Sequence, residues 1–410
     1  MAIQLAVSGG TPIRDTRLKP WPEWPANSEK EWEEEIAPIF KEVYMNKSEG
    51  LPATMSARFG QSFAAYCDAS FGMMMPSGTT SIAAGVVAAL DLDGLTDGGE
   101  VIIPNYTFIA TASAPLSVRC SLAFVDIDPV SFTMSPEAVE AAISHQTVAI
   151  LPVHLGGHPA DMGALLKIAD KHGLKVIEDC AQAHGAEYNG RKVGSLGHVG
   201  AFSFQSSKNL TSGEGGCLLT NDKEIRDRAW AFRDVGRRPG GERWEYPRLG
   251  WNYRTSEYLA GLLLSRLPHV ETQTDLRNSN ATYLSKGIDG IDGLTPPRSH
   301  PWVTQHGYHL YMMLYESASF GGKSRDAFIS ALQAEGVPCS PGYPRPLTEE
   351  GGIRAVSDRH PHLIRRFDCP NVESTCRQSV WLHQNVLLAP KDEMDDILSA
   401  IHKIKAAFTL

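Results

Sequence analysis

The sequence lacks an excess of positive charge and any long apolar run. Its 410 residues include 38 lysines and arginines against 47 acidic residues, which gives a formal net charge of -9. A basic surface that would attract nucleic acid is therefore not expected, and a DNA-binding role is disfavoured. No run approaches the roughly 18 consecutive apolar residues of a membrane span. The sequence thus predicts a protein that neither binds nucleic acid nor crosses a membrane.

The cysteines are few and unpaired in the sequence. There are seven, an odd number, and none forms a C-x-x-C motif. This pattern indicates reduced, buried thiols in a cytoplasmic protein. The first ten residues, MAIQLAVSGG, have neither the charged region nor the long apolar region of a signal peptide, which favours the same location.

A metal site is not expected. His154 and His158 are four residues apart, as in some metal-binding helices. Gly156 and Gly157 lie between them and disfavour the helix that such a pair would need. Spacing without its structural context is weak support for a metal.

The chain is long enough for two lobes, because single cores stop growing at about 250 to 300 residues. Strand and helix signals alternate over residues 78–220, which indicates an α/β fold with a mostly parallel sheet and helices on both faces. A stretch rich in glycine and proline at 289–305 is the best candidate linker. We therefore predict an arm and entry helix at 1–49, a large domain at 50–285 and a smaller α+β domain at 290–410.

The stretch 176–216 carries the strongest chemical signal. An apolar strand at 174–177 leads into Glu178 and Asp179, and a second strand at 199–204 precedes Lys208 and a glycine-rich turn. Open α/β sheets bind ligands at the carboxyl ends of such strands. A lysine that forms a Schiff base and a carboxylate that keeps a pyridine nitrogen protonated are what pyridoxal 5'-phosphate (PLP) needs from a protein. The alternative is that Asp179 caps a helix and Lys208 is a solvated loop charge.

Two further segments fit the same cofactor. Ser77, Gly78 and Thr79 precede an apolar helix predicted at 81–90, and free N–H groups at a helix start bind phosphate. The alternative there is an ordinary helix cap. Phe108 lies just beyond a strand predicted at 101–104, where an aromatic ring can stack on the pyridine. The alternative for Phe108 is packing in the core.

Three segments together resemble a known family. EDCAQAHGA at 178–186, GSLGHVGAFSF at 194–204 and KNLTSGEGG at 208–216 are similar to segments of the sugar and cyclitol aminotransferases of the DegT/DnrJ/EryC/StrS family. The resemblance extends over nearly the whole chain. It implies the PLP-dependent aspartate aminotransferase fold (fold type I) and a transaminase with PLP as its cofactor.

The resemblance also implies roles for individual residues. It implies that Gly78, Thr79 and Ser203 bind the cofactor phosphate and that Phe108 stacks on the face of the pyridine ring. Asp179 would bind the ring nitrogen, Gln182 the ring 3-oxygen, and Lys208 would hold PLP and move the proton. His184 either orients Asp179 or is a satisfied core histidine.

A segment at 249–254, LGWNYR, is similar to the family's G-x-N-Y-R. By resemblance, Asn252 contacts the cofactor phosphate of the neighbouring subunit, which implies a homodimer, or a pair of dimers, with shared active sites. A solvated loop is the alternative reading of this segment.

The substrates implied are an amino-acid donor, glutamine or glutamate, and a ketone on a cyclitol or sugar ring in aminoglycoside-like biosynthesis. The run CPNVESTCRQSVWLHQNVLLA at 369–389 is more similar to the branch of inosose aminotransferases and aminohydroxybenzoate synthase than to nucleotide-sugar members. A nucleotide-linked keto sugar stays open as an acceptor, because the loop 342–345 departs from that branch. Candidates for binding the donor carboxylate are Arg233, Arg238, Arg254 and Arg345.

Two other functions fit the sequence less well. Relatives that dehydrate deoxysugars have a histidine in place of the lysine, so Lys208 disfavours that activity. A PLP-binding regulator would be expected to carry a DNA-binding domain, and the acidic sequence shows no sign of one.

Overall fold

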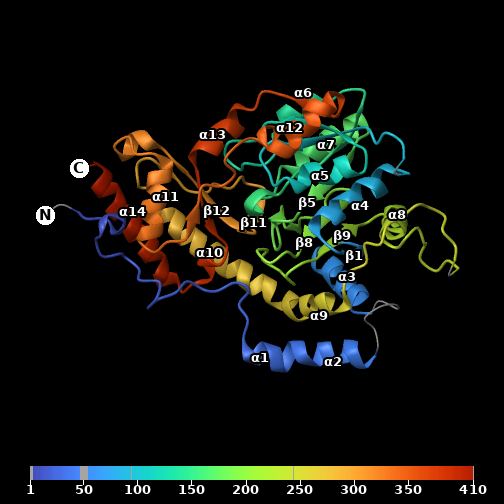
Figure 1. Ribbon diagram of the computed structural model, residues 1–410, viewed down its shortest axis with the longest axis horizontal. Coiled ribbons are helices and arrows are strands. Elements are labelled where there is room, and N and C mark those ends of the chain that lie inside the picture. The colour runs from blue at the N-terminus through green and yellow to red at the C-terminus, as the bar shows by residue number, and fades with distance from the viewer. Residues whose placement is uncertain (1–2, 47–53, 94, 243, 410) are drawn as a thin grey trace.

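An eight-stranded sheet forms the centre of the larger lobe (Figure 1). The computed structural model describes residues 3–46, 54–93, 95–242 and 244–409. In spatial order the strands are β1 (Phe71–Met75), β9 (Gly216–Thr220), β8 (Val199–Ser203), β5 (Lys175–Asp179), β4 (Thr147–Ile150), β2 (Glu100–Pro104), β3 (Ser121–Val125) and β14 (Ile364–Arg366). The six strands from β8 to β14 in this order run parallel, whereas β9 is antiparallel to both of its neighbours, β8 and β1.

Helices cover both faces of this sheet, because successive strand residues point to opposite sides and both sides are apolar. One face packs against α4 (Gly78–Leu90), α5 (Ala110–Ser117) and α8 (Lys223–Arg233). The other packs against α3 (Met55–Tyr66), α6 (Pro136–Ala142), α7 (Met162–His172) and α9 (Glu257–Arg266). The predicted fold class, a mostly parallel sheet with helices on both faces, is confirmed.

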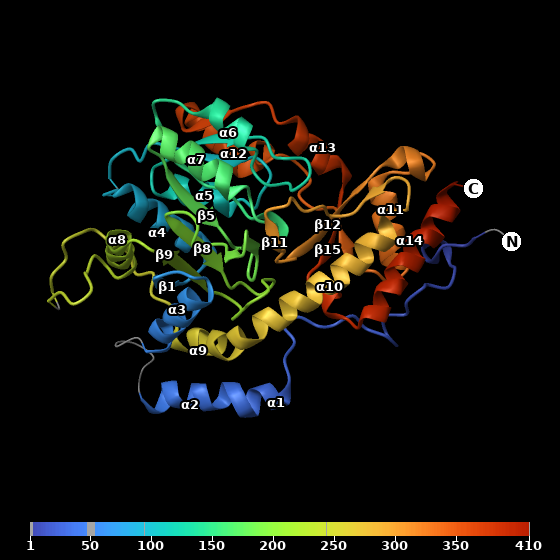
Figure 2. The same cartoon turned by 180° about the vertical axis from the view of Figure 1, so that it is seen from behind.

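A smaller antiparallel sheet forms the centre of the second lobe (Figure 2). Its order is β10 (Leu294–Thr295), β12 (Leu310–Tyr315), β15 (Ser379–His383) and β13 (Cys339–Ser340). The helices that bury it are α10 (Val270–Ile288), α11 (Arg325–Ala334) and α14 (Met394–Thr409), and α13 (Pro370–Gln378) packs on the side toward the large lobe. None of the described helices is long and apolar enough to span a bilayer.

The segment between the lobes is more structured than the sequence indicates. The helical stretch that begins at Glu257 is divided by a short turn at Leu267–His269, which contains a proline, and α10 then continues to Ile288. The expected linker at 289–305 contains β10 and β11 (Val303–Gln305), and β11 pairs with β6 (Glu187–Tyr188), which also pairs with β7 (Arg191–Lys192). Farther on, β14 and α12 (Gly351–Arg359) pack on the large lobe. The domain limits at 1–49, 50–285 and 290–410 stay predictions.

The amino-terminal arm runs from the small lobe to the large one. Arg14 is buried and forms ion pairs with Glu393 at 2.6 Å and Asp396 at 2.8 Å. The arm then leads to α1 (Glu29–Glu31), the π-helical turn Trp32–Ile36 and α2 (Ala37–Met45), which lie beneath α9 in Figure 1. Between these points, Trp24 Nε1 donates a hydrogen bond to the backbone oxygen of Lys208 (3.0 Å). The arm therefore contacts the segment that carries the predicted lysine.

Candidate active site

One cavity of about 550 Å³ lies between the two lobes. Its large-lobe wall contains the start of α4 and the carboxyl ends of β5 and β8, and its small-lobe wall contains residues of β12 and β15. Seven of the eight residues predicted from the sequence line it; these are Gly78, Thr79, Phe108, Asp179, Gln182, Ser203 and Lys208. The structure thus brings together segments up to 130 residues apart, and it leaves out Asn252.

Asp179 is the last residue of β5 and is only 5% exposed. Its Oδ2 accepts a hydrogen bond from Thr111 Oγ1 (2.8 Å), and its Oδ1 accepts one from the N–H of Ala181 (3.1 Å). Burial raises the pKa of the Asp179 carboxyl, while these bonds and the charge of Lys208 oppose that effect. Turns, not a helix, follow the residue, so a capping role does not fit. A buried carboxylate of this kind favours a cationic partner in the cavity.

Lys208 is half-buried in the turn after β8. Burial lowers the pKa of its amine to about 8, although the charge of Asp179 acts in the opposite direction. Among the described residues, Nζ has no hydrogen-bond partner and no acid within ion-pair distance. A solvated loop charge would not show this lowered pKa. A lysine amine with a pKa near neutrality can act as a nucleophile and as a base.

The start of α4 forms a cradle at the cavity edge. The helix begins at Gly78, three residues before the predicted start, and Ser77 caps it by accepting the N–H of Thr80 (3.2 Å). The N–H groups of Gly78 and Thr79 belong to the first turn, where no acceptor within the helix exists. A Cβ on Gly78 would lie 2.6 Å from that of Ser203, so only glycine lets the helix start approach β8 this closely. Two N–H groups and a hydroxyl next to each other fit a phosphate.

Gln182 and Phe108 face the same cavity from different loops. Gln182 Oε1 accepts the N–H of Gly156 (2.8 Å), and its Nε2 donates to the hydroxyl of Tyr343 (3.2 Å). Phe108 is 56% exposed, so the alternative of core packing is wrong for this ring. The residues present therefore fit PLP: an acid, an amine, a phosphate cradle and an accessible aromatic face.

His184 does not orient Asp179 and lies in the core of the large lobe. It makes no hydrogen bond to Asp179 and instead packs among Phe63, Phe202 and Phe204. Burial lowers the pKa of its imidazole to about 3. Asp179 is oriented by Thr111, which the sequence analysis missed because a threonine at the start of a helix carries no distinctive signal.

Asn252 lies on the exposed segment that follows α8, away from the cavity of its own chain. Its backbone forms an isolated antiparallel bridge with Asp234. Two large apolar side chains nearby are exposed, Leu249 by 68% and Trp251 by 61%. Apolar exposure of this size in one segment is typical of a surface that another protein covers.

None of the four arginines considered for the donor carboxylate lines the cavity. Arg254 pairs with Asp234 (2.7 Å) and Arg238 with Glu245 (3.1 Å). Arg233 is buried in α8, and Arg345 lies 3.6 Å from an oxygen of Glu350. Arg345 follows the cavity residue Tyr343 by two positions, which makes it the nearest of the four along the chain.

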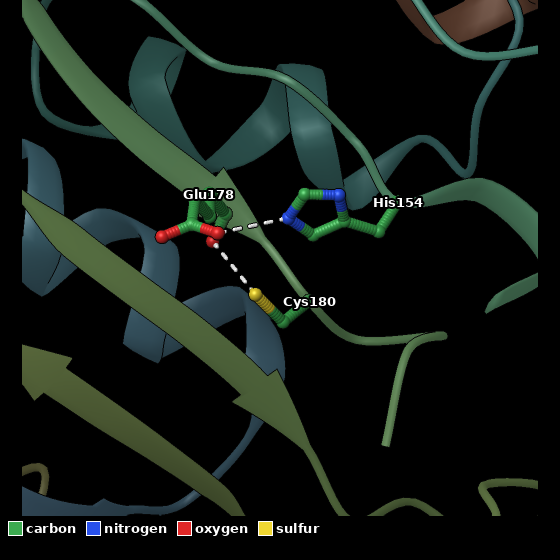
Figure 3. A group of neighbouring side chains, drawn as sticks. All are labelled: His154, Glu178 and Cys180. Atoms are coloured by element: carbon green, nitrogen blue, oxygen red, sulfur yellow. Dashed lines mark hydrogen bonds and ion pairs between the residues drawn. The ribbon is translucent and has the colours of Figure 1, made fainter. Parts of the chain in front are cut away.

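A buried group of possible metal ligands adjoins Asp179. The ligand atoms of His154, Glu178 and Cys180 lie within 4.8 Å of one another (Figure 3). His154 Nδ1 accepts the N–H of Ala160 (3.0 Å), so the ring proton lies on Nε2, which donates to Glu178 Oε2 (3.0 Å).

The Glu178 carboxylate is also saturated by backbone donors. Its oxygens accept the N–H groups of Gly194, Leu196 and Gly197. Burial raises the pKa of the Cys180 thiol well above its usual value. A metal would have to displace these bonds, so the group is a hydrogen-bond network that attaches the 194–197 turn to β5.

Residues 32–402 match the DegT/DnrJ/EryC1/StrS aminotransferase family. The chain belongs to this family. A protein of Streptoalloteichus tenebrarius named L-glutamine:2-deoxy-scyllo-inosose aminotransferase is 36% identical, with 98% of each chain covered. Another from the same organism, named putative L-glutamine:3-amino-2,3-dideoxy-scyllo-inosose aminotransferase, is also 36% identical, over 99% of this chain and 98% of the relative.

Solved structures of the family share the fold. The crystal structure of 3-amino-5-hydroxybenzoic acid synthase superposes with a TM-score of 0.81 at 27% identity, and the alignment covers 95% of this chain and 98% of that one. An aminotransferase from Psychrobacter cryohalolentis gives 0.84 at 29% identity over 95% and 100%. The protein is therefore a PLP-dependent aminotransferase of fold type I, as the sequence analysis predicted.

Proposed function

We propose that this protein transfers the amino group of glutamine, or of glutamate, to a ketone on a cyclitol ring in aminoglycoside-like biosynthesis. The main support is the cavity, in which Asp179 and Lys208 face the same space, together with relatives at 36% identity whose names specify glutamine and inososes. A nucleotide-linked keto sugar is the second candidate acceptor, and no contact in the cavity favours it.

The chain's own residues have distinct tasks in this proposal. When bound, PLP supplies an electron sink that stabilises negative charge on the donor's α-carbon. Lys208 would hold the cofactor, and its amine would serve as the base that takes the proton from that carbon. A pKa of about 8 keeps part of the amine neutral, as a base must be. Asp179 supplies the negative charge that keeps the ring nitrogen protonated, and its own buried charge is compensated at the same time.

The remaining residues position the cofactor. The N–H groups of Gly78 and Thr79 and the hydroxyl of Ser203 would bind the phosphate, and Phe108 would pack against the ring. Gln182 is fixed by Gly156 and Tyr343, so that its amide can reach the ring oxygen. The small-lobe wall is polar and aromatic, with Ser340, Tyr343, Trp381 and His383, which suits a ring that carries several hydroxyl groups.

We also propose a homodimer in which each Asn252 contacts the partner's cofactor phosphate. This rests on the position of Asn252 outside its own cavity and on the exposed apolar side chains beside it. A cytoplasmic location is supported by the seven cysteines, all of which are free and buried.

The test is a pair of half-reactions followed by visible absorbance. Purified protein with PLP should be yellow and should lose that colour with glutamine. The colourless form is then offered inososes and nucleotide-linked keto sugars. Return of the colour with inososes supports the proposal, whereas return only with nucleotide-linked sugars replaces the cyclitol acceptor by the second candidate. Return with neither would contradict both acceptors.

A further inference from the structure

A buried hydrogen-bond chain lies directly behind Lys208. Asn209, the next residue, is 1% exposed, and its Nδ2 donates to the backbone oxygen of Gly307 (2.7 Å). Because a carbonyl oxygen can only accept, this bond fixes the orientation of the Asn209 amide. Its Oδ1 then faces Nδ1 of His309 at 3.2 Å. The chain thus connects the lysine turn to the residues that precede β12.

This orientation determines where the proton of His309 lies. An amide oxygen only accepts, so Nδ1 of His309 must be the donor and must carry the hydrogen. In the neutral ring, Nε2 then has a free lone pair. His309 lines the active-site cavity, and its Nε2 has no hydrogen-bond partner among the residues that the structure describes. The lone pair is therefore available to a molecule in the cavity.

The surroundings keep this imidazole neutral. Burial is the main cause that lowers the pKa of His309 well below its usual value, and the positive charge of Lys208 adds to it, with smaller effects from His184, His383 and Arg277. Arg277 is itself buried and is held by two hydrogen bonds to Gln384, not by an acid. The charged groups that act on His309 are thus all positive, and Nε2 remains an acceptor at physiological pH.

We propose that His309 is a substrate-binding residue whose Nε2 accepts a hydrogen bond from an uncharged N–H or O–H group of the substrate, and that Asn209 positions it by fixing the tautomer. The inference rests on the proposed function. A carboxylate has lone pairs but no hydrogen to donate, so binding of a carboxylate next to Nε2 of His309 is disfavoured. Two substrate groups have the required chemistry, the carboxamide of glutamine and a ring hydroxyl of the acceptor.

The first experiment removes the acceptor atom and then restores it. His309→Phe keeps a ring but has no lone pair, whereas the amide oxygen of His309→Gln can reach the position of Nε2. We expect His309→Phe to lower kcat/KM about tenfold in the half-reaction whose substrate makes the bond, as for loss of one hydrogen bond, and His309→Gln to recover most of it. Loss with glutamine identifies the carboxamide, and loss with the ring ketone identifies a hydroxyl.

The second experiment changes Nε2 of His309 from a hydrogen-bond acceptor into a donor. In Asn209→Asp, a carboxylate beside Nδ1 should raise the pKa of His309, so that Nε2 becomes a donor as the pH falls toward neutrality. In this variant the preference for glutamine over glutamate, or the affinity for the ketone, should then fall with decreasing pH. In the wild type the same quantity should not change with pH. Asn278→Asp is the matched control, because that amide donates to the backbone oxygens of Thr274 and His306 and does not line the cavity.

Three results would overturn the inference. The first is that His309→Phe leaves the rates of both half-reactions unchanged. The second is that His309→Gln does not restore the rate lost in His309→Phe and that the loss accompanies weaker PLP binding. The third is that Asn209→Asp and Asn278→Asp show the same dependence on pH. The cofactor's absorbance and the melting temperature report folding in each variant. If the wild type accepted no ring ketone while His309→Phe still slowed the glutamine half-reaction, the proposed acceptor would fail and this inference would stand.

Discussion

The two walls of the active-site cavity differ in how the chain builds them. The large-lobe wall comes from strand ends and from the turn of a helix, each next to a recognisable segment such as 77–80 or 178–186. The small-lobe wall gathers His309, Ser340, Tyr343, Trp381 and His383 from separate strands and a loop. The first wall has the residues that fit PLP, and the second faces the rest of the cavity.

Because of this difference, we expect substitutions in the two walls to have different effects. A substitution in the large-lobe wall should affect both half-reactions, because the cofactor takes part in each. A substitution in the small-lobe wall should affect one substrate more than another.

Lys208→Ala should have the largest effect. Loss of the amine removes both the attachment of PLP and the base, so we expect turnover to fall by about 1000-fold or more in both half-reactions. The yellow colour should also be lost. Lys192→Ala is a useful control, because Lys192 is largely buried but pairs with Glu187 and Glu271 outside the cavity. A Lys208→Ala protein that transaminated normally would place the nucleophile elsewhere.

Asp179→Ala should separate attachment from catalysis. The yellow colour should persist, since Lys208 is intact, but both half-reactions should slow by about 100- to 1000-fold, as for loss of one preorganised electrostatic partner. Thr111→Val keeps the Asp179 charge but removes the 2.8 Å hydrogen bond to its Oδ2, together with a 3.0 Å bond to Thr107, and should cost far less. Equal losses in the two variants would show that the orientation of Asp179, not its charge, is what matters.

Mixing two inactive proteins tests whether the large-lobe wall is shared between subunits. In a heterodimer of Lys208→Ala and Asn252→Ala chains, one site has both defects and the other has none. Random mixing makes half of the dimers heterodimers, so about a quarter of the wild-type sites should be intact. The recovered activity is measured after subunit exchange and compared with each variant alone. No recovery despite proven heterodimers would place Asn252 outside the partner's site.

The lowered pKa of Lys208 should be visible in cofactor uptake. The neutral amine is the nucleophile, so the rate at which cofactor-free protein turns yellow with PLP should rise with pH and level off above a pKa of about 8. Asp179→Asn removes a negative charge that raises this pKa, and its profile should therefore shift to lower pH. Stability of the cofactor-free protein should also increase between pH 8 and the unfolded-state pKa, because the unfolded chain binds more protons there. A plateau only near the ordinary lysine pKa would contradict the burial of this amine.

The sequence predicted the large-lobe wall well for a physical reason. Gly78, Asp179, Ser203 and Lys208 lie at strand ends or helix starts, and parallel topology brings such positions together at one edge of the sheet. His309 directly precedes β12, and the sequence contains no information on how that strand packs across the cavity. Thr111 was missed because only tertiary packing places its hydroxyl on Asp179.

The linker shows the same limit. The pattern predicted a break at 289–305, whereas β11 within it pairs with β6. Short strands of two or three residues gain their stability from the partner strand, so their own residues carry little signal. Side chains that meet across such long-range contacts are those that sequence patterns place least well.

The smallest predicted effect concerns a hydrogen bond that joins the two walls. Tyr343, from the small-lobe side, accepts the bond from Gln182 Nε2 (3.2 Å), and burial raises the pKa of its hydroxyl, which keeps it neutral. Tyr343→Phe should lower kcat/KM by about two- to tenfold, the usual range for one neutral hydrogen bond.

Tyr106→Phe is the matched control for this change. Tyr106 belongs to the same aromatic cluster, and its hydroxyl bonds to Ser379 (3.2 Å) without reaching Gln182. If Gln182 mainly holds the cofactor, Tyr343→Phe should slow both half-reactions equally and weaken PLP retention. If Tyr343 mainly shapes the acceptor's space, only the ketone half-reaction should slow. Because Tyr343 touches both walls, the ratio of the two losses measures how far cofactor binding and substrate choice are separate in this enzyme.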